Sequence, residues 1–239
     1  MSKSPDRLVI LTGAGISAES GLPTFRGADG LWEGHRVEDV ASPVAFARDP
    51  ELVHRFYNLR RAALRTVEPN AAHLALARLE AAWRGSFLLV TQNVDDLHDR
   101  AGSRRLLHMH GELIRARCKA CRHGWEWRDD LSPDSICPSC GKSGRVRPDI
   151  VWFGEEPLHL GEIFDALSRA SLFIAIGTSG HVYPAAGFVD VARGAGARAI
   201  EINLADTAAS AAFDERRTGP ATDLVPALVE ELLAAQSVG

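Results

Sequence analysis

Four cysteines place the strongest constraint on how this chain can fold. Cys118 and Cys121 form one Cys-x-x-Cys pair, Cys137 and Cys140 form a second, and the 239 residues contain no other cysteine. Two such pairs at this spacing can place four thiolates around one Zn²⁺, and a closed Cys₄ shell leaves no open coordination position. We therefore expect one structural zinc, in a module inside a larger domain, because apolar segments continue on both sides.

Two other interpretations of the cysteines remain open at this stage. Two disulfides would need an oxidising compartment, and a thioredoxin-like redox pair would not need a second matched pair. The apolar run at residues 8–11 is too short for a signal peptide. With no targeting segment and every cysteine assigned to metal, we expect a cytoplasmic protein.

Composition excludes two classes of partner. The formal net charge of -4 gives no support for a nucleic-acid groove, which normally shows a basic excess. No apolar run approaches the roughly 20 residues that span a bilayer. We expect neither a nucleic-acid nor a membrane partner, and the sequence gives no oligomeric state.

Strands and helices alternate along most of the chain. Continuous apolar runs predict buried parallel strands at 8–11 (LVIL), 87–90 (FLLV), 172–176 (LFIAI) and 199–202 (AIEI). Asn70 is a suitable N-cap for a helix reaching Trp83, and further helices are expected at 157–167, 184–191 and 226–233. This order predicts an α/β fold with a Rossmann-like, doubly wound parallel sheet.

Two stretches interrupt that alternation. Residues 31–69 are helix-like without a strong strand, and residues 113–147 hold the cysteines. We expect these insertions to form a small zinc-ribbon plus helical domain, whereas 1–30, 70–112 and 148–239 form the Rossmann-like domain. The cleft between the two domains would be the default active site.

A glycine-rich loop directly follows the first predicted strand. Residues 13–18 read Gly-Ala-Gly-Ile-Ser-Ala, a variant of the dinucleotide fingerprint whose glycines let the backbone approach a pyrophosphate. The pattern alone is also compatible with a simple turn. The usual acidic residue about twenty positions later is not clearly present, with Glu33 and Glu38 as the candidates, so an ordinary dehydrogenase site is not expected.

Taken in order, several motifs resemble the sirtuins, which are NAD-dependent protein-lysine deacylases. They are residues 13–27 (GAGISAESGLPTFRG), 91–98 (TQNVDDLH), 110–111 (HG), the four cysteines, 177–179 (GTS) and 203–204 (NL). The resemblance covers nearly the whole chain. It implies a large Rossmann-like domain with a small zinc-ribbon and helical domain, NAD as co-substrate and acylated-lysine proteins or peptides as substrates.

The resemblance also implies a reaction. Sirtuins cleave the nicotinamide–ribose bond of NAD and transfer the acyl group from lysine to the ribose, which releases nicotinamide, lysine and O-acyl-ADP-ribose. Such a site must hold two substrates in line and exclude water from a charged intermediate. A base must then activate a ribose hydroxyl, and an imidazole suits this role because its pKa lies near neutrality.

Two histidines are candidates for that base. From the residues alone His108 and His110 are equal, because alternate residues of a strand face one side, and either could be a packing or surface histidine. The family match selects His110. Asn93 and Asp95 follow a buried strand, where α/β sheets place ligands, although a polar turn capping the next helix would look the same. The resemblance makes Asn93 a second catalytic residue.

The resemblance assigns the remaining cofactor contacts by motif. Phe25 and Arg26 match a mobile loop in which Phe25 would shield the reactive ribose carbon and Arg26 would help to hold the cofactor. Asp96 occupies a variable position and is assigned no role. The expected cofactor-binding residues are Gly13, Ala14, Gly15, Ile16, Ser17, Ala18, Glu19, Thr24, Phe25, Arg26, Trp32, Gln92, Asn93, Val94, Asp95, Gly177, Thr178, Ser179, Asn203, Leu204, Ala205 and Ala221.

Two further segments concern the substrate. Val151, Trp152, Phe153, Gly154 and Glu155 resemble the segment that pairs with the substrate peptide, to which an extended chain can add through main-chain bonds.

Tyr57 and Arg60, at i and i+3 of a predicted helix, resemble the branch that removes malonyl and succinyl groups. Residues 30–36 (GLWEGHR) resemble bacterial members of the same branch. An arginine fork can bind the distal carboxylate while the tyrosine hydroxyl adds a hydrogen bond. Without the family, both would be ordinary helix-surface residues. We expect desuccinylation and demalonylation together with deacetylation.

Three other functions would fit parts of the chain. A non-catalytic zinc-ribbon module that binds protein or nucleic acid leaves the glycine loop and residues 92–95 unexplained. An NAD-dependent ADP-ribosyltransferase would release nicotinamide but label protein. An oxidoreductase would produce reduced cofactor.

Overall fold

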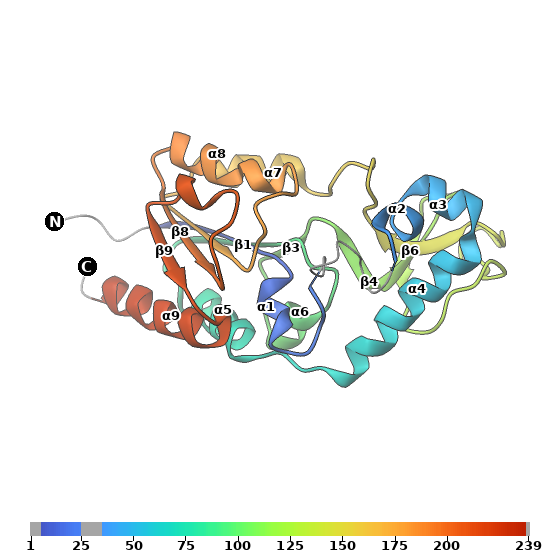
Figure 1. The fold of residues 1–239 in the computed structure, drawn as a ribbon, viewed down its shortest axis with the longest axis horizontal. Coiled ribbons are helices and arrows are strands. Elements are labelled where there is room, and N and C mark those ends of the chain that lie inside the picture. The colour runs from blue at the N-terminus through green and yellow to red at the C-terminus, as the bar shows by residue number, and fades with distance from the viewer. Residues whose placement is uncertain (1–5, 25–34, 238–239) are drawn as a thin grey trace.

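The computed structural model describes residues 6–24 and 35–237, so that Phe25, Arg26 and Trp32 lie outside the described residues. The described chain contains two sheets (Figure 1), one of six strands and one of three. The described part contains no helix long and apolar enough to cross a membrane.

The larger sheet is entirely parallel and has the strand order β3-β2-β1-β7-β8-β9. Its strands are β1 (Arg7–Thr12), β2 (Ser86–Thr91), β3 (Leu106–His108), β7 (Leu172–Ile176), β8 (Arg198–Asn203) and β9 (Glu215–Thr218). The chain runs outward from β1 to β2 and β3 on one side, then returns to β7, β8 and β9 on the other. This reversal confirms the predicted doubly wound, Rossmann-like α/β fold.

Helices cover both faces of this sheet (Figure 1). One face packs against α1 (Gly15–Ala18), α5 (Ala71–Ala82) and α9 (Ala221–Ser237), and the other against α7 (Leu160–Leu167), η2 (Ala185–Gly187) and α8 (Phe188–Gly194). The strands β1, β2 and β7 are buried on both faces, which explains why each is a continuous apolar run rather than an alternating one. The remaining elements near this sheet are α6 (Leu97–Ala101) and η3 (Ser210–Ala212).

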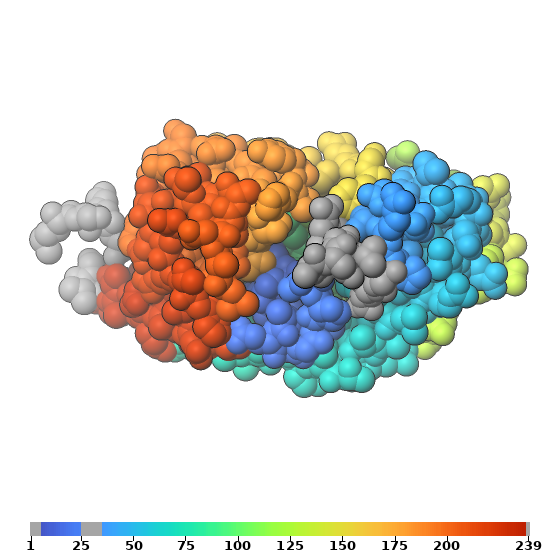
Figure 2. Space-filling view, viewed as in Figure 1, coloured from blue at the N-terminus to red at the C-terminus, as the bar shows by residue number. Residues whose placement is uncertain are grey.

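The smaller sheet is antiparallel, with the order β5-β4-β6. Its strands are β4 (Gly111–Cys118), β5 (Gly124–Glu126) and β6 (Val146–Ile150). A hydrophobic cluster joins it to the helices of the first insertion, which are α2 (Val37–Val40), α3 (Pro43–Arg48), α4 (Pro50–Ala63) and η1 (Leu64–Thr66). In Figure 2 these segments, blue to cyan, lie at the opposite end of the molecule from the orange and red C-terminal part.

Several element boundaries differ from the sequence-based predictions. The last helix begins at Ala221 rather than Pro226, which lies inside it. The Glu19 carboxylate accepts hydrogen bonds from the backbone N–H and the hydroxyl of Thr222. A residue distant in sequence thus provides the acceptor for a backbone N–H of the first helical turn. The expected helix at 157–167 begins only at Leu160, and the one expected at 184–191 is η2 followed by α8.

Two strands of the large sheet were not among the apolar runs predicted as buried strands. β3 is three residues long, and β9 reads Glu-Arg-Arg-Thr without an apolar run. Both are edge strands, and a strand at the edge of a sheet is less buried than a central one, so it needs no continuous apolar run.

The helix capped by Asn70 was predicted correctly, and its capping box uses the His73 side chain in place of the usual glutamate. The division of the chain into domains stays a prediction.

Candidate active site and metal centre

The carboxyl ends of β1, β2 and β7 meet at the point where the strand order reverses. Here the loop after β1 contacts the loop after β7 through the backbone. Gly13 N–H donates to Ile176 O at 3.0 Å, and Gly15 N–H donates to Gly177 O at 2.9 Å. Open α/β sheets bind ligands in the crevice beside such a reversal.

The glycines of these two loops are needed for the contact itself. Gly177 has φ +62°, and a Cβ there would lie 2.5 Å from the backbone nitrogen of Ile16. A Cβ on Gly15 would lie 2.6 Å from Gly177 Cα, and one on Gly13 would lie 2.7 Å from Gly177 O. The Gly-x-Gly motif is therefore required for loop-to-loop packing, in addition to any approach of a ligand to the backbone.

Ser17 connects the two polar residues that follow β2. Its hydroxyl accepts from Asn93 Nδ2 at 3.0 Å and donates to Asp95 Oδ2 at 3.1 Å. Asp95 also accepts the Leu97 N–H, as expected of a turn that begins a helix. Burial raises the pKa of Asp95, while the bonds from Leu97 and Ser17 oppose that rise. Asp95 thus belongs to a polar turn that begins the next helix, as one of the two interpretations predicted. The side chains of Asn93 and Asp95 also contact Ser17, which follows the glycine loop.

The two candidate histidines have different environments. His108 ends β3, and its Nε2 lies 3.0 Å from Asp99 Oδ2. Burial acts to lower the pKa of His108, but the hydrogen bond and charge of Asp99 raise it above its usual value. His110 lies beyond the strand, and its Nδ1 lies 3.1 Å from Gln92 O. The two imidazoles are therefore not equivalent positions of one strand.

The partner of His110 fixes which ring nitrogen can act as a base. A backbone carbonyl only accepts, so Nδ1 must carry a proton, and in the neutral ring Nε2 keeps its lone pair. Burial lowers the pKa of His110, against the smaller opposing effect of the bond to Gln92. A half-buried imidazole that is neutral near pH 7, with a free Nε2 lone pair, is suited to accept a proton from a substrate hydroxyl.

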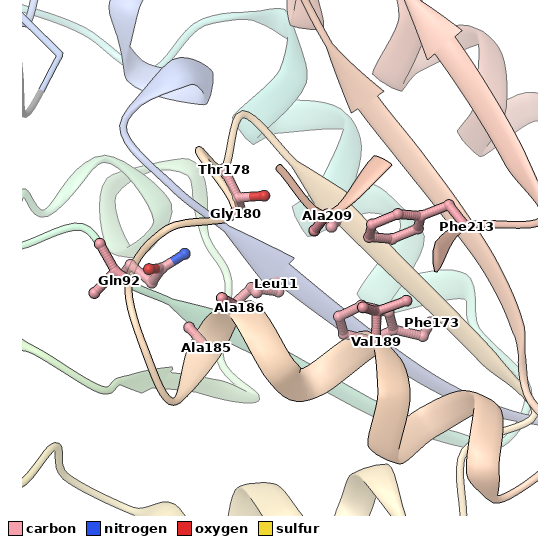
Figure 3. Close-up of a pocket in the computed structure, with 12 residues that line it drawn as sticks. Leu11, Gln92, Phe173, Thr178, Gly180, Ala185, Ala186, Val189, Ala209 and Phe213 are labelled. Carbon is pink, nitrogen blue, oxygen red and sulfur yellow. The ribbon is translucent and has the colours of Figure 1, made fainter. Parts of the chain in front are cut away.

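A small pocket of about 10 Å³, close to the space that one water molecule needs, lies beneath the loop after β7 (Figure 3). Gln92, Thr178 and Gly180 lie at its polar end. The rest of the lining is apolar and comes from β1, β7, α8 and the segment around η3. The polar end contains Gln92 and Thr178, two of the residues expected to contact the cofactor.

The remaining cofactor candidates lie on or beside these loops. Asn203 Nδ2 donates to Thr178 O at 2.6 Å, which ties the end of β8 to the loop after β7. Leu204 is 63% exposed, and Ala221 starts α9. Ala14, Ile16 and Ala18 belong to the first loop and α1, and Glu19 follows them. Thr24 and Ala205 lie in loops, and Val94 packs against the hydrophobic cluster that includes α4. Ser179 Oγ accepts a hydrogen bond from His181 N–H.

The expected peptide-binding segment continues β6 and then turns. Val151 N–H donates to His110 O at 2.8 Å, so the segment is bonded to the backbone of the residue that carries the candidate base. Glu155 N–H donates to Trp152 O at 2.9 Å, and Gly154 has φ +87°. The Glu155 carboxylate accepts from two nitrogens of Arg147, at 2.6 and 3.0 Å, and from Trp152 N–H at 2.9 Å. Glu155 therefore holds the turn in place.

Tyr57 and Arg60 lie on α4, and neither is an ordinary surface residue. Tyr57 is 0% exposed, and its hydroxyl accepts a hydrogen bond from Trp152 Nε1 at 2.9 Å. Burial raises the pKa of Tyr57 far above its usual value, so the phenol keeps its proton and can donate it. Arg60 is half-buried, with its guanidinium carbon 5.6 Å from the centre of the Phe56 ring.

The four cysteines form a compact cluster in the loops of the smaller sheet. Their sulfurs lie within 4.8 Å of one another, with Cys118–Cys140 at 3.8 Å and Cys121–Cys137 at 3.7 Å. A tetrahedron with Zn–S bonds of about 2.3 Å has edges of about 3.8 Å, whereas a disulfide is about 2.05 Å long. The donor set therefore fits one Zn²⁺ and does not fit disulfides. Within residues 6–24 and 35–237 no other such cluster of metal-binding side chains occurs.

Sequence reasoning missed a buried polar layer beneath the glycine loop. Thr12 Oγ1 donates to Thr91 Oγ1 at 2.9 Å and lies 3.0 Å from His98 Nε2. Thr91 Oγ1 in turn accepts the Asn93 N–H at 3.1 Å. The sequence did contain a signal for this layer, because two adjacent parallel strands each end in a threonine and the register Thr12↔Thr91 places the two side by side. His73, which was read only as part of a helix, lies 3.4 Å from Ser17 Oγ.

The family model named Sir2 family matches residues 13–184, which is more than half of the chain. The chain belongs to the Sir2 family. A Bdellovibrio bacteriovorus protein named NAD-dependent protein deacylase is 62% identical to this Sir2 chain over 228 residues, covering 95% of the chain and 96% of that protein. An Escherichia coli protein with the same name is 55% identical over 235 residues, covering 98% and 84%.

Solved structures of Sir2 proteins have the same fold as this family member. A Sir2 homologue in complex with ADP-ribose is 41% identical with a TM-score of 0.91, and covers 98% of this chain and 95% of its own. A Sir2 homologue in complex with NAD is 42% identical with a TM-score of 0.88, and covers 97% and 91%. The predicted sirtuin resemblance and fold are thereby confirmed.

Proposed function

We propose that this chain is an NAD-dependent protein-lysine deacylase that removes succinyl and malonyl groups as well as acetyl groups. The products would be nicotinamide, free lysine and O-acyl-ADP-ribose. Membership of the Sir2 family and relatives named NAD-dependent protein deacylase support the enzyme class. The observation that supports the chemistry best is the pairing of His110 Nδ1 with Gln92 O, next to Asn93 at the end of β2.

NAD fits the meeting point of the loops after β1 and β7. The glycines there allow the two loops to meet through their backbones, and Ser17, Asn93 and Asp95 supply buried polar groups. When bound, NAD supplies the ribose carbon that the acyl oxygen attacks as nicotinamide leaves. Asn93 and Asp95 would orient the nicotinamide ribose and carboxamide, while Ser17 fixes both side chains.

His110 would act as the general base. Its Nε2 would accept the proton of a ribose hydroxyl, which then attacks the transferred acyl carbon. The Gln92 carbonyl holds the ring in the tautomer that this step requires. The contact between His110 O and Val151 N–H keeps the base next to the segment proposed to bind the peptide.

The remaining assignments rest on the family motifs. Gly177, Thr178 and Ser179 would contact phosphate and ribose, and Asn203, Leu204, Ala205 and Ala221 would contact the adenosine half. Residues 13–19, Thr24, Gln92 and Val94 would line the same site. Phe25, Arg26 and Trp32 are proposed cofactor contacts that lie outside the described residues.

Acyl-group selection is assigned to Tyr57 and Arg60. A guanidinium fork binds a carboxylate through two charge-assisted hydrogen bonds, and a protonated phenol can add a third. The raised pKa of Tyr57 is consistent with this donor role. Acetyl groups lack the distal carboxylate, so they would depend less on Arg60.

Peptide binding is assigned to residues 151–155, where main-chain bonds would read little side-chain sequence. The zinc would be structural, because the four thiolates leave no open position. We also propose that the small domain comprises 31–69 and 113–147 and that the protein acts in the cytoplasm. Cysteines arranged for metal rather than disulfides support that compartment.

Mass spectrometry of matched acetyl-lysine and succinyl-lysine peptides, each with and without NAD, tests the proposal. The expected result is NAD-dependent loss of both groups with the corresponding O-acyl-ADP-ribose appearing. Loss of acetyl alone would contradict the acid-binding pocket. ADP-ribose attached to protein without deacylation would instead support an ADP-ribosyltransferase.

A further inference from the structure

We infer that Glu201 is a positioning residue that holds together two loops, one proposed to contact phosphate and ribose of NAD and the other its adenosine half. This inference rests on the proposed function. Glu201 lies on β8, between Ala175 of β7 and Arg216 of β9 in the sheet register, and is 3% exposed. Within the described residues, no arginine or lysine forms an ion pair with it.

The carboxylate is instead satisfied by hydroxyl groups of the following loop. Thr207 Oγ1 donates to Glu201 Oε1 at 2.7 Å, and Ser210 Oγ donates to Glu201 Oε2. These two residues also bind each other's segment, since Ser210 Oγ accepts the Thr207 N–H at 2.7 Å and Thr207 Oγ1 accepts the Ala209 N–H at 3.2 Å. A buried carboxylate without a counter-ion is costly unless such bonds are complete. The loop geometry is therefore tied to Glu201.

This loop in turn packs directly on the loop after β7. Gly180 has φ +68°, and a Cβ there would lie 2.9 Å from Ala209 N and 3.3 Å from Thr207 Oγ1. Figure 3 shows Ala209 close to Gly180 and Thr178, and all three line the small pocket. Asn203 Nδ2 forms a second link between the two loops by donating to Thr178 O.

Glu201 therefore determines where two separate loops meet. One loop contains Thr178 and Ser179, and the other begins with Asn203 and Leu204. Loosening the Glu201–Thr207 bond would leave Asn93 and His110 unaffected, because neither contacts this loop. The expected consequence is weaker binding of the adenosine diphosphate half with little change in the chemical step.

Thr207→Val and Thr207→Ser form a matched pair for the test, since valine keeps the shape and serine keeps the hydroxyl. The first readout is the Kd for ADP-ribose by calorimetry, and the second is the KM for NAD against kcat in deacylation. We expect Thr207→Val to raise both Kd and KM about fivefold with kcat within about twofold, and Thr207→Ser to match the unmodified protein. Glu201→Gln, which keeps the side-chain volume, should raise Kd in the same direction.

Thr66→Val is the control, because its hydroxyl donates only to Ala63 O at the end of α4. The inference is overturned if folded Thr207→Val and Glu201→Gln both bind ADP-ribose as tightly as the unmodified protein. It is also overturned if kcat falls as much as 1/KM. If the unmodified protein binds ADP-ribose but deacylates nothing, the proposed function fails while the variants still test the role of Glu201.

Discussion

The indole Nε1 of Trp152 donates a hydrogen bond to the buried hydroxyl of Tyr57 at 2.9 Å, across 95 positions of sequence. Trp152 is 2% exposed, and the guanidinium carbon of Arg147 lies 3.2 Å from the centre of its ring. Arg147 also binds the Glu155 carboxylate. The segment proposed to bind the peptide and the helix proposed to select the acyl group are thus one packed unit.

Replacing Arg60 with methionine should separate the acyl activities. Methionine keeps an apolar stem but removes the fork for the distal carboxylate, so kcat/KM for desuccinylation should fall about 10- to 100-fold. Deacetylation should stay within about threefold. Steady-state rates on matched acetyl and succinyl peptides measure both. Equal loss of the two activities would contradict the pocket assignment.

Tyr57→Phe is the companion variant and should behave differently. It leaves the Trp152 N–H buried without its acceptor, which costs about 1–3 kcal/mol of unfolding free energy. Urea denaturation should show this loss. Unchanged stability of Tyr57→Phe would mean that the indole finds another partner.

The candidate base can be tested by its pH dependence. The pKa of His110 is lowered, so its neutral form persists below pH 6.5, and kcat/KM should lose activity on the acid side only below that value. His110→Asn should reduce kcat about 10²- to 10⁴-fold and remove this acid limb. His108→Asn is the control, because His108 binds Asp99 and should affect the rate far less. A His108 variant with the larger loss would reverse the assignment.

Removing zinc should unfold the cysteine module first. A closed Cys₄ site contributes directly to folding, and β4 and β6 meet at Cys118↔Val146 within the cysteine cluster. Cys137→Ser, or chelation verified by metal analysis, should abolish hydrogen-exchange protection at Ala116 and Val146 and abolish activity. Amides of β1 and β7 should stay protected for longer. Metal-free protein with normal protection and full activity would show that the metal has no structural role.

His54 should make the protein sensitive to acid. It is 2% exposed, both ring nitrogens lack a hydrogen-bond partner among the described residues, and burial, aided by the charge of Arg61, lowers its pKa to about 4. Because the folded pKa lies below the unfolded value of about 6.5, its contribution to stability is full above pH 6.5 and is lost as the pH falls toward 4.

His54→Leu should therefore reduce the slope of unfolding free energy against pH by about 1 kcal/mol per pH unit between pH 6 and 4. Urea unfolding at several pH values measures the difference in slope. The pKa of His73 is also lowered to about 4, but His73 is present in both proteins and so does not contribute to that difference. Stability at pH 7 should not fall, since leucine leaves no unpaired nitrogen. Identical slopes would show that His54 takes up no extra proton on unfolding.

Much of the fold follows from patterns that are local in the chain. The apolar runs at 8–11, 87–90 and 172–176 all lie in strands buried on both faces, and Asn70 caps the helix it was expected to cap. The four cysteines form one cluster with zinc-like sulfur spacing, as their positions predicted. The roles of individual site residues stay predictions to be tested.

The sequence by itself determined the strands β1, β2, β7 and β8, the capped helix and the grouping of the four cysteines, because each depends on neighbouring residues or on a fixed spacing. The sirtuin resemblance selected His110 over His108, and only the tertiary structure shows how their surroundings differ, with Gln92 O beside His110 and Asp99 beside His108. Packing across the chain likewise buried Tyr57 beneath Trp152 and started α9 at Ala221 beside Glu19. These features depend on partners 95 and 203 positions away, and local patterns contain no information about which distant groups will satisfy a buried polar atom.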